Sequence, residues 1–337
     1  MKILFIHSEG NNTHYNDYMS DLLLHGLRQL LGFQVIDYPG SWYMYSDEIL
    51  NRQYDKNKLW GKGLTIKNTL NNYNSIDRTD IEKKIQNKYF DLVIYSSIRR
   101  SDLFLESVIK YNNKFLFIDG EDDNYIDERY SNSGLYFKRE LVNNKSNLIP
   151  ISFAVPKEKI LKDINEKPIN LLAPLIPGRL STYIYEDEKT YYNMYANSIF
   201  GITNKKLGWD TLRHYEILMN GCIPLFLNIE DCPKLTLTTL PKDRLLNIYN
   251  NFHRILQLYS PFKIYKKKFL SIKKIFSYIP NMFKNKSAPT FLRDNSKVLE
   301  IKNELLNYTH QKLTTESLAK YVLSKHNYWS TGGPLIR

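Results

Sequence analysis

The chain has 337 residues, of which 42% are hydrophobic and 24% are charged, and its formal net charge is +12. This length allows two domains that each bury a core, and the composition is ordinary for a soluble globular protein. Only Cys222 and Cys232 are present as cysteines, and no histidine cluster accompanies them, so neither a disulfide framework nor a metal site is expected. Because the sequence shows no signal-peptide core and no long apolar run, we expect a cytoplasmic protein without a membrane span.

The first 150 residues predict strands that alternate with helices. Apolar strands are expected at 2–7, 33–38, 90–95 and 114–118, and helices up to residue 31, at 81–86 and at 101–110. Such an alternation predicts a parallel, doubly wound α/β sheet. Ligands of these sheets bind beyond the carboxyl ends of the strands, which directs attention to the loops after His7, Tyr95 and Ile118.

Titratable residues follow two of these strands. An acidic turn comes after the fourth strand, where repulsion between carboxylates can raise the pKa of one of them, although a solvated acidic turn is the alternative. A histidine ends the first strand and can titrate near neutrality, although a structural histidine is the alternative. The candidate catalytic residues are therefore Asp119, Glu121, Asp122 and His7.

The second half of the chain predicts a further α/β domain. The proline-punctuated stretch 148–156 is expected to cross from a first domain, 1–150, to a second, 151–310, with a helix and tail at 311–337. Predicted elements are a strand at 169–173, a helix at 185–197, a strand and turn at 240–245, and helices at 299–307 and 314–325. Two such halves in tandem would leave a cleft between them.

The stretch 198–226 predicts a strand, a polar loop, an amphipathic helix and a second strand. Asp210 and Thr211 suit the amino-terminal cap of the helix, and Asn220-Gly221 suits its end. Arg213 and Glu216 are three residues apart and share one face near the amino terminus of the helix, where partial positive charge suits a phosphate. A surface ion pair between them is the alternative.

The sequence from Ser198-Ile-Phe-Gly-Ile to Glu216, followed by Gly221-Cys-Ile-Pro224, resembles the donor-nucleotide motif of GT-B glycosyltransferases. The similarity is greatest to the exostosin-like and the family 1 and 4-like groups, in which an arginine is followed three residues later by a glutamate and then by Gly-Cys-Ile-Pro. It covers residues 197–233 in detail, with less diagnostic similarity at 60–65 and 137–141. Within the last stretch, a solvated face is expected for Lys138 and Arg139, with a phosphate contact as the alternative.

The resemblance implies two tandem Rossmann-like sheets that face an interdomain cleft. It implies transfer of a sugar from a nucleotide-diphosphate donor to a hydroxyl of a surface glycan or glycolipid, without a metal or a cofactor. Arg213 is expected on the diphosphate and Glu216 on the ribose hydroxyls. Trp209 is expected either to stack on a base or sugar or to pack in the core. The candidate donor-binding residues are Arg179, Gly208, Trp209, Asp210, Thr211, Arg213 and Glu216.

The net positive charge is concentrated in one segment. Residues 262–287 contain eight lysines and no acidic residue, and their large apolar side chains recur at helical spacing. This predicts an insert that binds the anionic inner face of a membrane, and the alternative is a surface helix with solvated lysines. A DNA- or protein-modifying glycosyltransferase and a nucleic-acid-binding protein remain as other functions. A Rossmann oxidoreductase is disfavoured because no GxGxxG follows the first strand.

Overall fold

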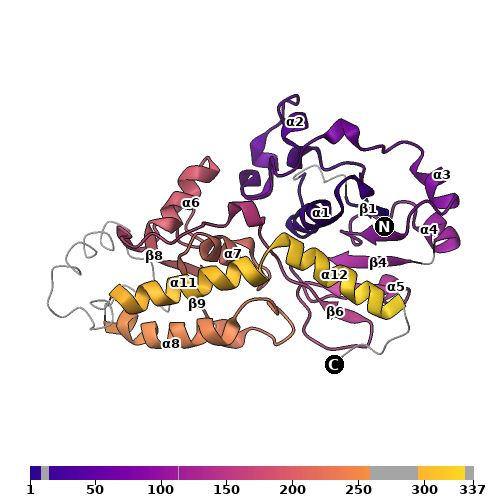
Figure 1. Cartoon of the computed structure of the whole chain (residues 1–337). Helices are drawn as coiled ribbons and strands as arrows, with labels where there is room; N and C mark the ends of the chain where they lie inside the picture. The colour runs from indigo at the N-terminus through magenta and orange to yellow at the C-terminus, as the bar shows by residue number, and fades with distance from the viewer. Residues whose placement is uncertain (9–14, 113, 259–294, 331–337) are drawn as a thin grey trace.

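The computed structural model describes residues 1–8, 15–112, 114–258 and 295–330, and its described part is an α/β protein with two parallel sheets (Figure 1). The predicted basic insert at 262–287 lies outside the described residues. The helices and strands, in chain order, are β1 (Ile3–Ile6), α1 (Tyr18–Leu31), β2 (Val35–Tyr38), α2 (Ser46–Ile49), α3 (Ile81–Gln86), β3 (Leu92–Tyr95), α4 (Leu105–Tyr111), β4 (Phe115–Asp119), α5 (Glu128–Ser131), β5 (Leu135–Lys138), β6 (Leu148–Pro150), β7 (Asn170–Leu172), α6 (Glu188–Ala196), β8 (Ser198–Asn204), α7 (Leu212–Met219), β9 (Ile223–Leu227), α8 (Lys242–Leu258), α11 (Asn295–Lys312) and α12 (Thr315–Ser330).

The larger sheet has six parallel strands in the order β2-β1-β3-β4-β5-β6. We call residues 1–150, which contain this sheet, the first unit. The strands β1 and β3 are wholly buried, as expected for a sheet with helices on both faces. The strand order reverses direction between β1 and β3, so the loops after these two strands open a crevice at their carboxyl ends.

The smaller sheet has three parallel strands in the order β7-β8-β9. We call residues 170–258, which contain it, the second unit. Gly201 in β8 lets α7 approach closely, because a Cβ there would lie 3.1 Å from the side chain of Ile217. This close packing holds α7 against β8, so the loop between them joins two elements that are fixed relative to each other.

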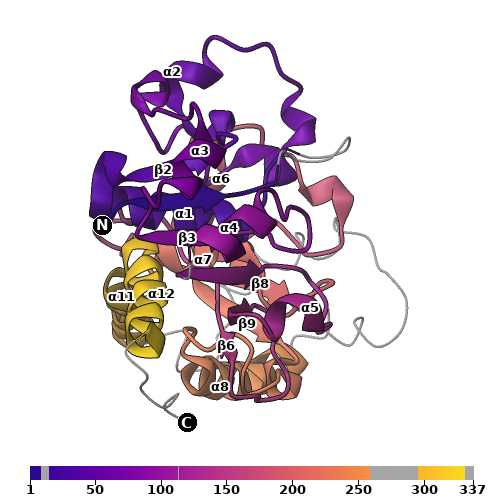
Figure 2. The same ribbon diagram turned by 90° about the vertical axis from the view of Figure 1, so that its right-hand side faces the viewer.

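The last described helix returns to the first unit. Whereas α11 packs against α7 and β9, α12 packs against α1 (Figure 1), and Figure 2 shows α12 on one flank of the larger sheet. The Nδ1 atom of His25 in α1 lies 2.8 Å from the hydroxyl of Thr315, and both groups are buried. A Cβ on Gly26 would collide with the carbonyl of Thr315, so the two helices are in backbone contact at this point.

The alternation of strands and helices confirms the α/β, Rossmann-like part of the predicted fold class. Three details differ. The strand β5 was not expected, residues 148–150 form the edge strand β6 rather than a crossing, and the predicted strand and turn at 240–245 is the start of helix α8. Pro241 suits the start of this helix, because its fixed φ is compatible with a helix and it has no amide that would lack a partner there. Its carbonyl accepts the first helical hydrogen bond, from the amide of Leu245. None of the described helices is long and apolar enough to cross a membrane.

Candidate functional site

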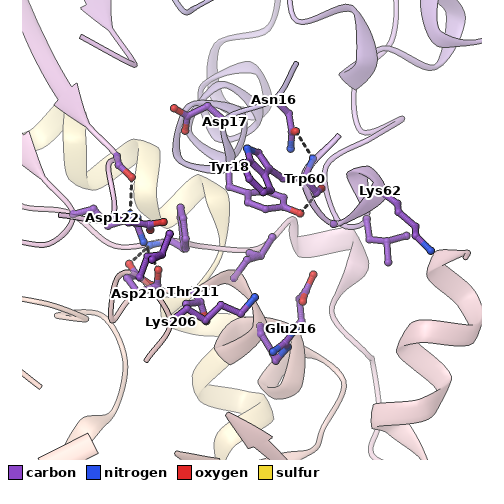
Figure 3. Close-up of a pocket in the computed structure, with 18 of the residues that line it drawn as sticks. Asn16, Asp17, Tyr18, Trp60, Lys62, Asp122, Lys206, Asp210, Thr211 and Glu216 are labelled. Atoms are coloured by element: carbon purple, nitrogen blue, oxygen red, sulfur yellow. Dashed lines mark hydrogen bonds and ion pairs between the residues drawn. The ribbon is translucent and has the colours of Figure 1, made fainter. Parts of the chain in front are cut away.

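A cavity of about 580 Å³ lies between the two units and is lined by both of them (Figure 3). The first unit contributes the start of α1, the loop at 60–64, and the loops that follow β3, β4 and β5. The second unit contributes residues 183–191, the loop between β8 and α7, and the first turns of α7. The carboxyl ends of strands from both sheets therefore face the same space, which is where α/β folds bind ligands.

Two cations of the second unit face this cavity. Arg213 is buried, its guanidinium carbon lies 5.0 Å from the centre of the Tyr183 ring, and its Nε has no hydrogen-bond partner among the described residues. Lys206 is exposed to the cavity, yet the surrounding protein lowers its pKa and the nearby charge of Arg213 lowers it further. Burial opposes ionisation of the Tyr183 phenol, but the two cations outweigh it and lower the pKa of this group.

These two cations have no carboxylate partner. The ion pairs found in the described part of the chain include neither Lys206 nor Arg213. Both side chains therefore present positive charge to the cavity, where low-dielectric walls strengthen their attraction for an anion.

Glu216 is buried on the same wall and accepts one hydrogen bond from each unit. Its Oε1 accepts from the hydroxyl of Thr65 at 2.7 Å, and its Oε2 accepts from the hydroxyl of Tyr191 at 2.6 Å. Burial raises the pKa of Glu216, and these two donors oppose that rise. The alternative of a surface pair between Arg213 and Glu216 is wrong, because both side chains are buried and Glu216 uses its oxygens on hydroxyl groups.

Thr65 is held against the second unit in an unusual backbone conformation. Its φ of 77° lies in the left-handed region, which is costly for a β-branched residue. Its amide donates to Glu188 at 2.6 Å, and its hydroxyl lies 2.8 Å from that of Tyr192 as well as bonding to Glu216. Lys62, three residues earlier, forms an ion pair with Glu186. Hydrogen bonds and an ion pair from residues 62–65 of the first unit therefore bind this segment to the second unit beside the cavity.

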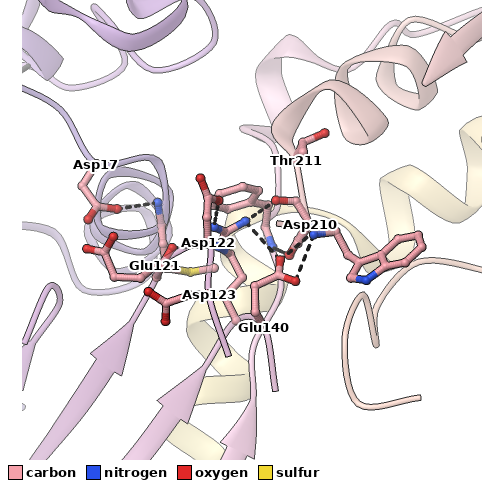
Figure 4. A network of polar contacts seen from close by, with 12 residues as sticks. Asp17, Glu121, Asp122, Asp123, Glu140, Asp210 and Thr211 are labelled. Atoms are coloured by element: carbon pink, nitrogen blue, oxygen red, sulfur yellow. Dashed lines mark hydrogen bonds and ion pairs between the residues drawn. The ribbon is translucent and has the colours of Figure 1, made fainter. Parts of the chain in front are cut away.

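The loop between β8 and α7 is held by the residues that follow β5 (Figure 4). The carboxylate of Glu140 accepts the amides of Trp209 and Asp210, each at 2.9 Å. The guanidinium of Arg139, 2% exposed, donates to the carbonyl of Asp210 and forms an ion pair with Asp122. The amides of Trp209 and Asp210, two of the predicted donor-binding residues, are therefore both occupied by Glu140.

Two titratable groups in and beside this loop, Asp210 and His214, are buried. Burial raises the pKa of Asp210 to about 7, against the opposing charge of Arg139, and its Oδ2 accepts the amide of Phe153 at 2.9 Å. Burial lowers the pKa of His214 to about 3, so this ring is neutral. Its nitrogens lie 2.8 Å from the hydroxyl of Thr203 and 2.8 Å from the carbonyl of Trp209. His214 therefore joins β8, the loop and α7.

Of the acidic residues after β4, Glu121 and Asp122 line the cavity and Asp119 does not. Glu121 bonds to Arg100 at 2.5 Å, while the Asp122 side chain is 50% exposed. Asp119 is buried in an ion pair with Lys138 at 3.0 Å. The expectation of a solvated face for Lys138 and Arg139 is wrong, because both are buried among carboxylates that become neighbours only through the parallel pairing of β4 and β5.

Four other predicted site residues do not line the cavity: His7, Arg179, Gly208 and Trp209. The Nε2 of His7 accepts the amide of Gly40 at 3.2 Å, and burial lowers the pKa of this ring, so it supports a turn of the first unit. The ring of Trp209 packs at 6.3 Å from that of Phe226, which is the core alternative named above. The predicted residues that meet at the cavity are Glu121, Asp122, Asp210, Thr211, Arg213 and Glu216.

The sequence pattern did not single out several residues that line the cavity or hold the residues lining it: Thr65, Glu140, Tyr183, Tyr191, Lys206 and His214. Lys206 lies in a polar loop with no periodicity, and Thr65 and Glu140 act through partners that are distant in sequence. Some signal was within reach. Thr65 and Glu140 lie in the stretches 60–65 and 137–141, which carry the weaker similarity, and His214 lies on the same turn of α7 as Arg213.

Within the described residues, no group of three or more His, Cys, Asp and Glu side chains is arranged to hold a metal ion. No protein-family model matches the chain, and a search of curated proteins finds no match. The cavity is therefore interpreted from its own geometry.

Proposed function

We propose that the chain is a GT-B glycosyltransferase that moves a sugar from a nucleotide-diphosphate donor to a hydroxyl of a glycan or glycolipid. The observation that carries this proposal is the pair Lys206 and Arg213, which face the cavity between the two units without a carboxylate partner among the described residues. A nucleotide-diphosphate sugar carries two phosphates, so its charge matches the pair.

The chemistry of transfer needs such a pair. When the bond between the anomeric carbon and the diphosphate breaks, negative charge grows on the leaving diphosphate, and fixed cations lower the energy of that state. Thr211, which lines the cavity at the start of α7, adds a hydroxyl that can donate to a phosphate oxygen.

The acceptor hydroxyl loses a proton during transfer, and a carboxylate near it can take that proton. Glu121 and Asp122 are the candidates, because they line the cavity from the first unit. Each is paired with an arginine, Glu121 with Arg100 and Asp122 with Arg139, which orients the carboxylate toward its place on the wall.

Glu216 would bind the ribose of the donor. Its carboxylate is buried at the cavity and accepts two hydroxyl hydrogen bonds, from Thr65 and Tyr191. A group of this geometry suits the two vicinal hydroxyls of a ribose, and in the bound state one of them would take the place of the Thr65 hydroxyl.

The test is a thermal-shift titration with the nucleoside diphosphates UDP and GDP and their sugars. A nucleotide that binds the folded protein raises its stability by RT ln(1 + [L]/Kd), so the right nucleotide shifts the midpoint in a concentration-dependent way. Lys206→Ala and Arg213→Ala should each weaken this shift. Lys205→Ala is the matched control, because Lys205 is the adjacent lysine, contacts Trp209 and does not line the cavity. No shift with any nucleotide would refute the proposal, and so would shifts that are equal in all four proteins.

A further inference from the structure

Trp60 presents an indole ring to the cavity from the first unit. Of the aromatic side chains that line the cavity in the described part of the chain, it is the exposed one, at 49%. Figure 3 shows Trp60 and Tyr18 on the wall opposite Lys206 and Glu216. The ring is therefore on the side of the cavity where an acceptor, rather than the phosphates of a donor, would lie.

The backbone of Trp60 is fixed from both sides. Its amide donates to Oδ1 of Asn16 at 2.7 Å, and its carbonyl accepts from the hydroxyl of Tyr18 at 2.6 Å. The next two residues, Gly61 and Lys62, are both left-handed, with φ of 53° and 58°. A Cβ on Gly61 would collide with the hydroxyl of Tyr18 and displace the group that binds the Trp60 carbonyl, so glycine is favoured at this turn. Because two hydrogen bonds fix the backbone of Trp60, its exposed ring is preorganised to bind a ligand.

Asn16 provides a polar group beside the ring. The residue is 2% exposed and lines the cavity, and its Nδ2 has no hydrogen-bond partner among the described residues. Its Oδ1 faces the amide of Trp60, which fixes the orientation of the side-chain amide and leaves Nδ2 as a donor. A buried donor without a partner is costly, so a ligand oxygen that accepts from it is expected.

We infer that Trp60 and Asn16 form the subsite that binds the acceptor saccharide. One face of a pyranose ring carries mainly C–H groups and stacks on the negative face of an aromatic ring, while its rim carries hydroxyls that accept hydrogen bonds. The indole of Trp60 supplies the ring contact, and Nδ2 of Asn16 supplies the donor to a rim oxygen. This inference rests on the proposed function, since it assigns the acceptor of the same transfer.

Saturation-transfer NMR with methyl glycosides of glucose, galactose, mannose and N-acetylglucosamine tests the subsite, with and without the nucleotide identified by thermal shift. Trp60→Ala should weaken glycoside binding roughly tenfold, whereas Trp60→Phe, which keeps an aromatic face, should weaken it by a factor of about three or less. Asn16→Asp keeps the acceptor for the amide of Trp60 and replaces the donor, so it should also weaken binding roughly tenfold. All three variants should keep the nucleotide shift of the wild type.

The outcomes separate this inference from the proposed function. The subsite is refuted if no glycoside binds the wild type, or if Trp60→Ala binds glycosides as the wild type does. It is also refuted if Trp60→Ala lowers nucleotide affinity, because the indole would then belong to the nucleotide site. Nucleotide binding that is lost in Lys206→Ala and kept in Trp60→Ala upholds the donor site whatever the glycosides do.

Discussion

Removal of the Glu140 carboxylate should release the loop that carries Lys206. Glu140 is buried and accepts two amide hydrogen bonds of 2.9 Å, from Trp209 and Asp210. A hydrogen bond to a charged group contributes about 1.5–3 kcal/mol, so Glu140→Ala should lower the free energy of unfolding by about 3–6 kcal/mol. Glu140→Gln keeps one carbonyl acceptor and places its NH2 group against the other backbone amide, so about half of that loss is expected.

The assay is urea unfolding of the full chain, followed by nucleotide thermal shift on the folded variants. Glu300→Ala, on an exposed position of α11, is the control and should change the free energy of unfolding by less than about 0.5 kcal/mol. If the loop carries the phosphate contact, Glu140→Gln should also weaken the nucleotide shift. The reasoning is refuted if Glu140→Ala costs less than about 1 kcal/mol and binds nucleotide as the wild type does.

Two further predictions concern neighbouring buried groups. Because burial raises the pKa of Asp210 in the folded protein from 3.8 to about 7, its contribution to stability is full below pH 3.8 and is lost as the pH rises to 7. The free energy of unfolding of the wild type, relative to Asp210→Asn, should therefore fall by about 4 kcal/mol between pH 4 and pH 8 in urea titrations, and a flat difference would contradict this. Thr65→Ser keeps the hydroxyl that donates to Glu216 and should change the free energy of unfolding in urea little. Thr65→Val deprives the buried Glu216 carboxylate of this donor and should lower the free energy of unfolding by about 1–3 kcal/mol. Equal stabilities of the two variants would show that this hydroxyl is unimportant.

The sequence predicted the local part of the site. The order of strand, loop, helix and strand at 198–226 follows from apolar runs and cap residues, and the spacing of Arg213 and Glu216 placed both on one buried face of α7. These features depend on neighbours within one turn of helix or one loop. For the same reason, the predicted bounds of helix α3 agree with the structure, since its two apolar residues recur at helical spacing.

The contacts between distant segments could not be predicted in this way. Lys138 reads as a surface residue, because the carboxylate that neutralises it is on a different strand and becomes adjacent only when β4 and β5 pair. The sequence around Glu140 likewise gives no sign of its role, because the loop at 208–210 that donates to its carboxylate is distant in sequence. The acidic turn after β4 was read as one cluster, but its carboxylates face different partners, so only Glu121 and Asp122 reach the cavity.

The return of α12 to the first unit has a consequence for the order of folding. The contact between Gly26 of α1 and Thr315 of α12 joins residues almost the whole described length of the chain apart. During synthesis, the first unit emerges early but its α1 face stays uncovered until residues 315–330 have been made. A fragment ending at residue 150 would expose that apolar helix face to other chains, so the unit that comes first in sequence is completed last.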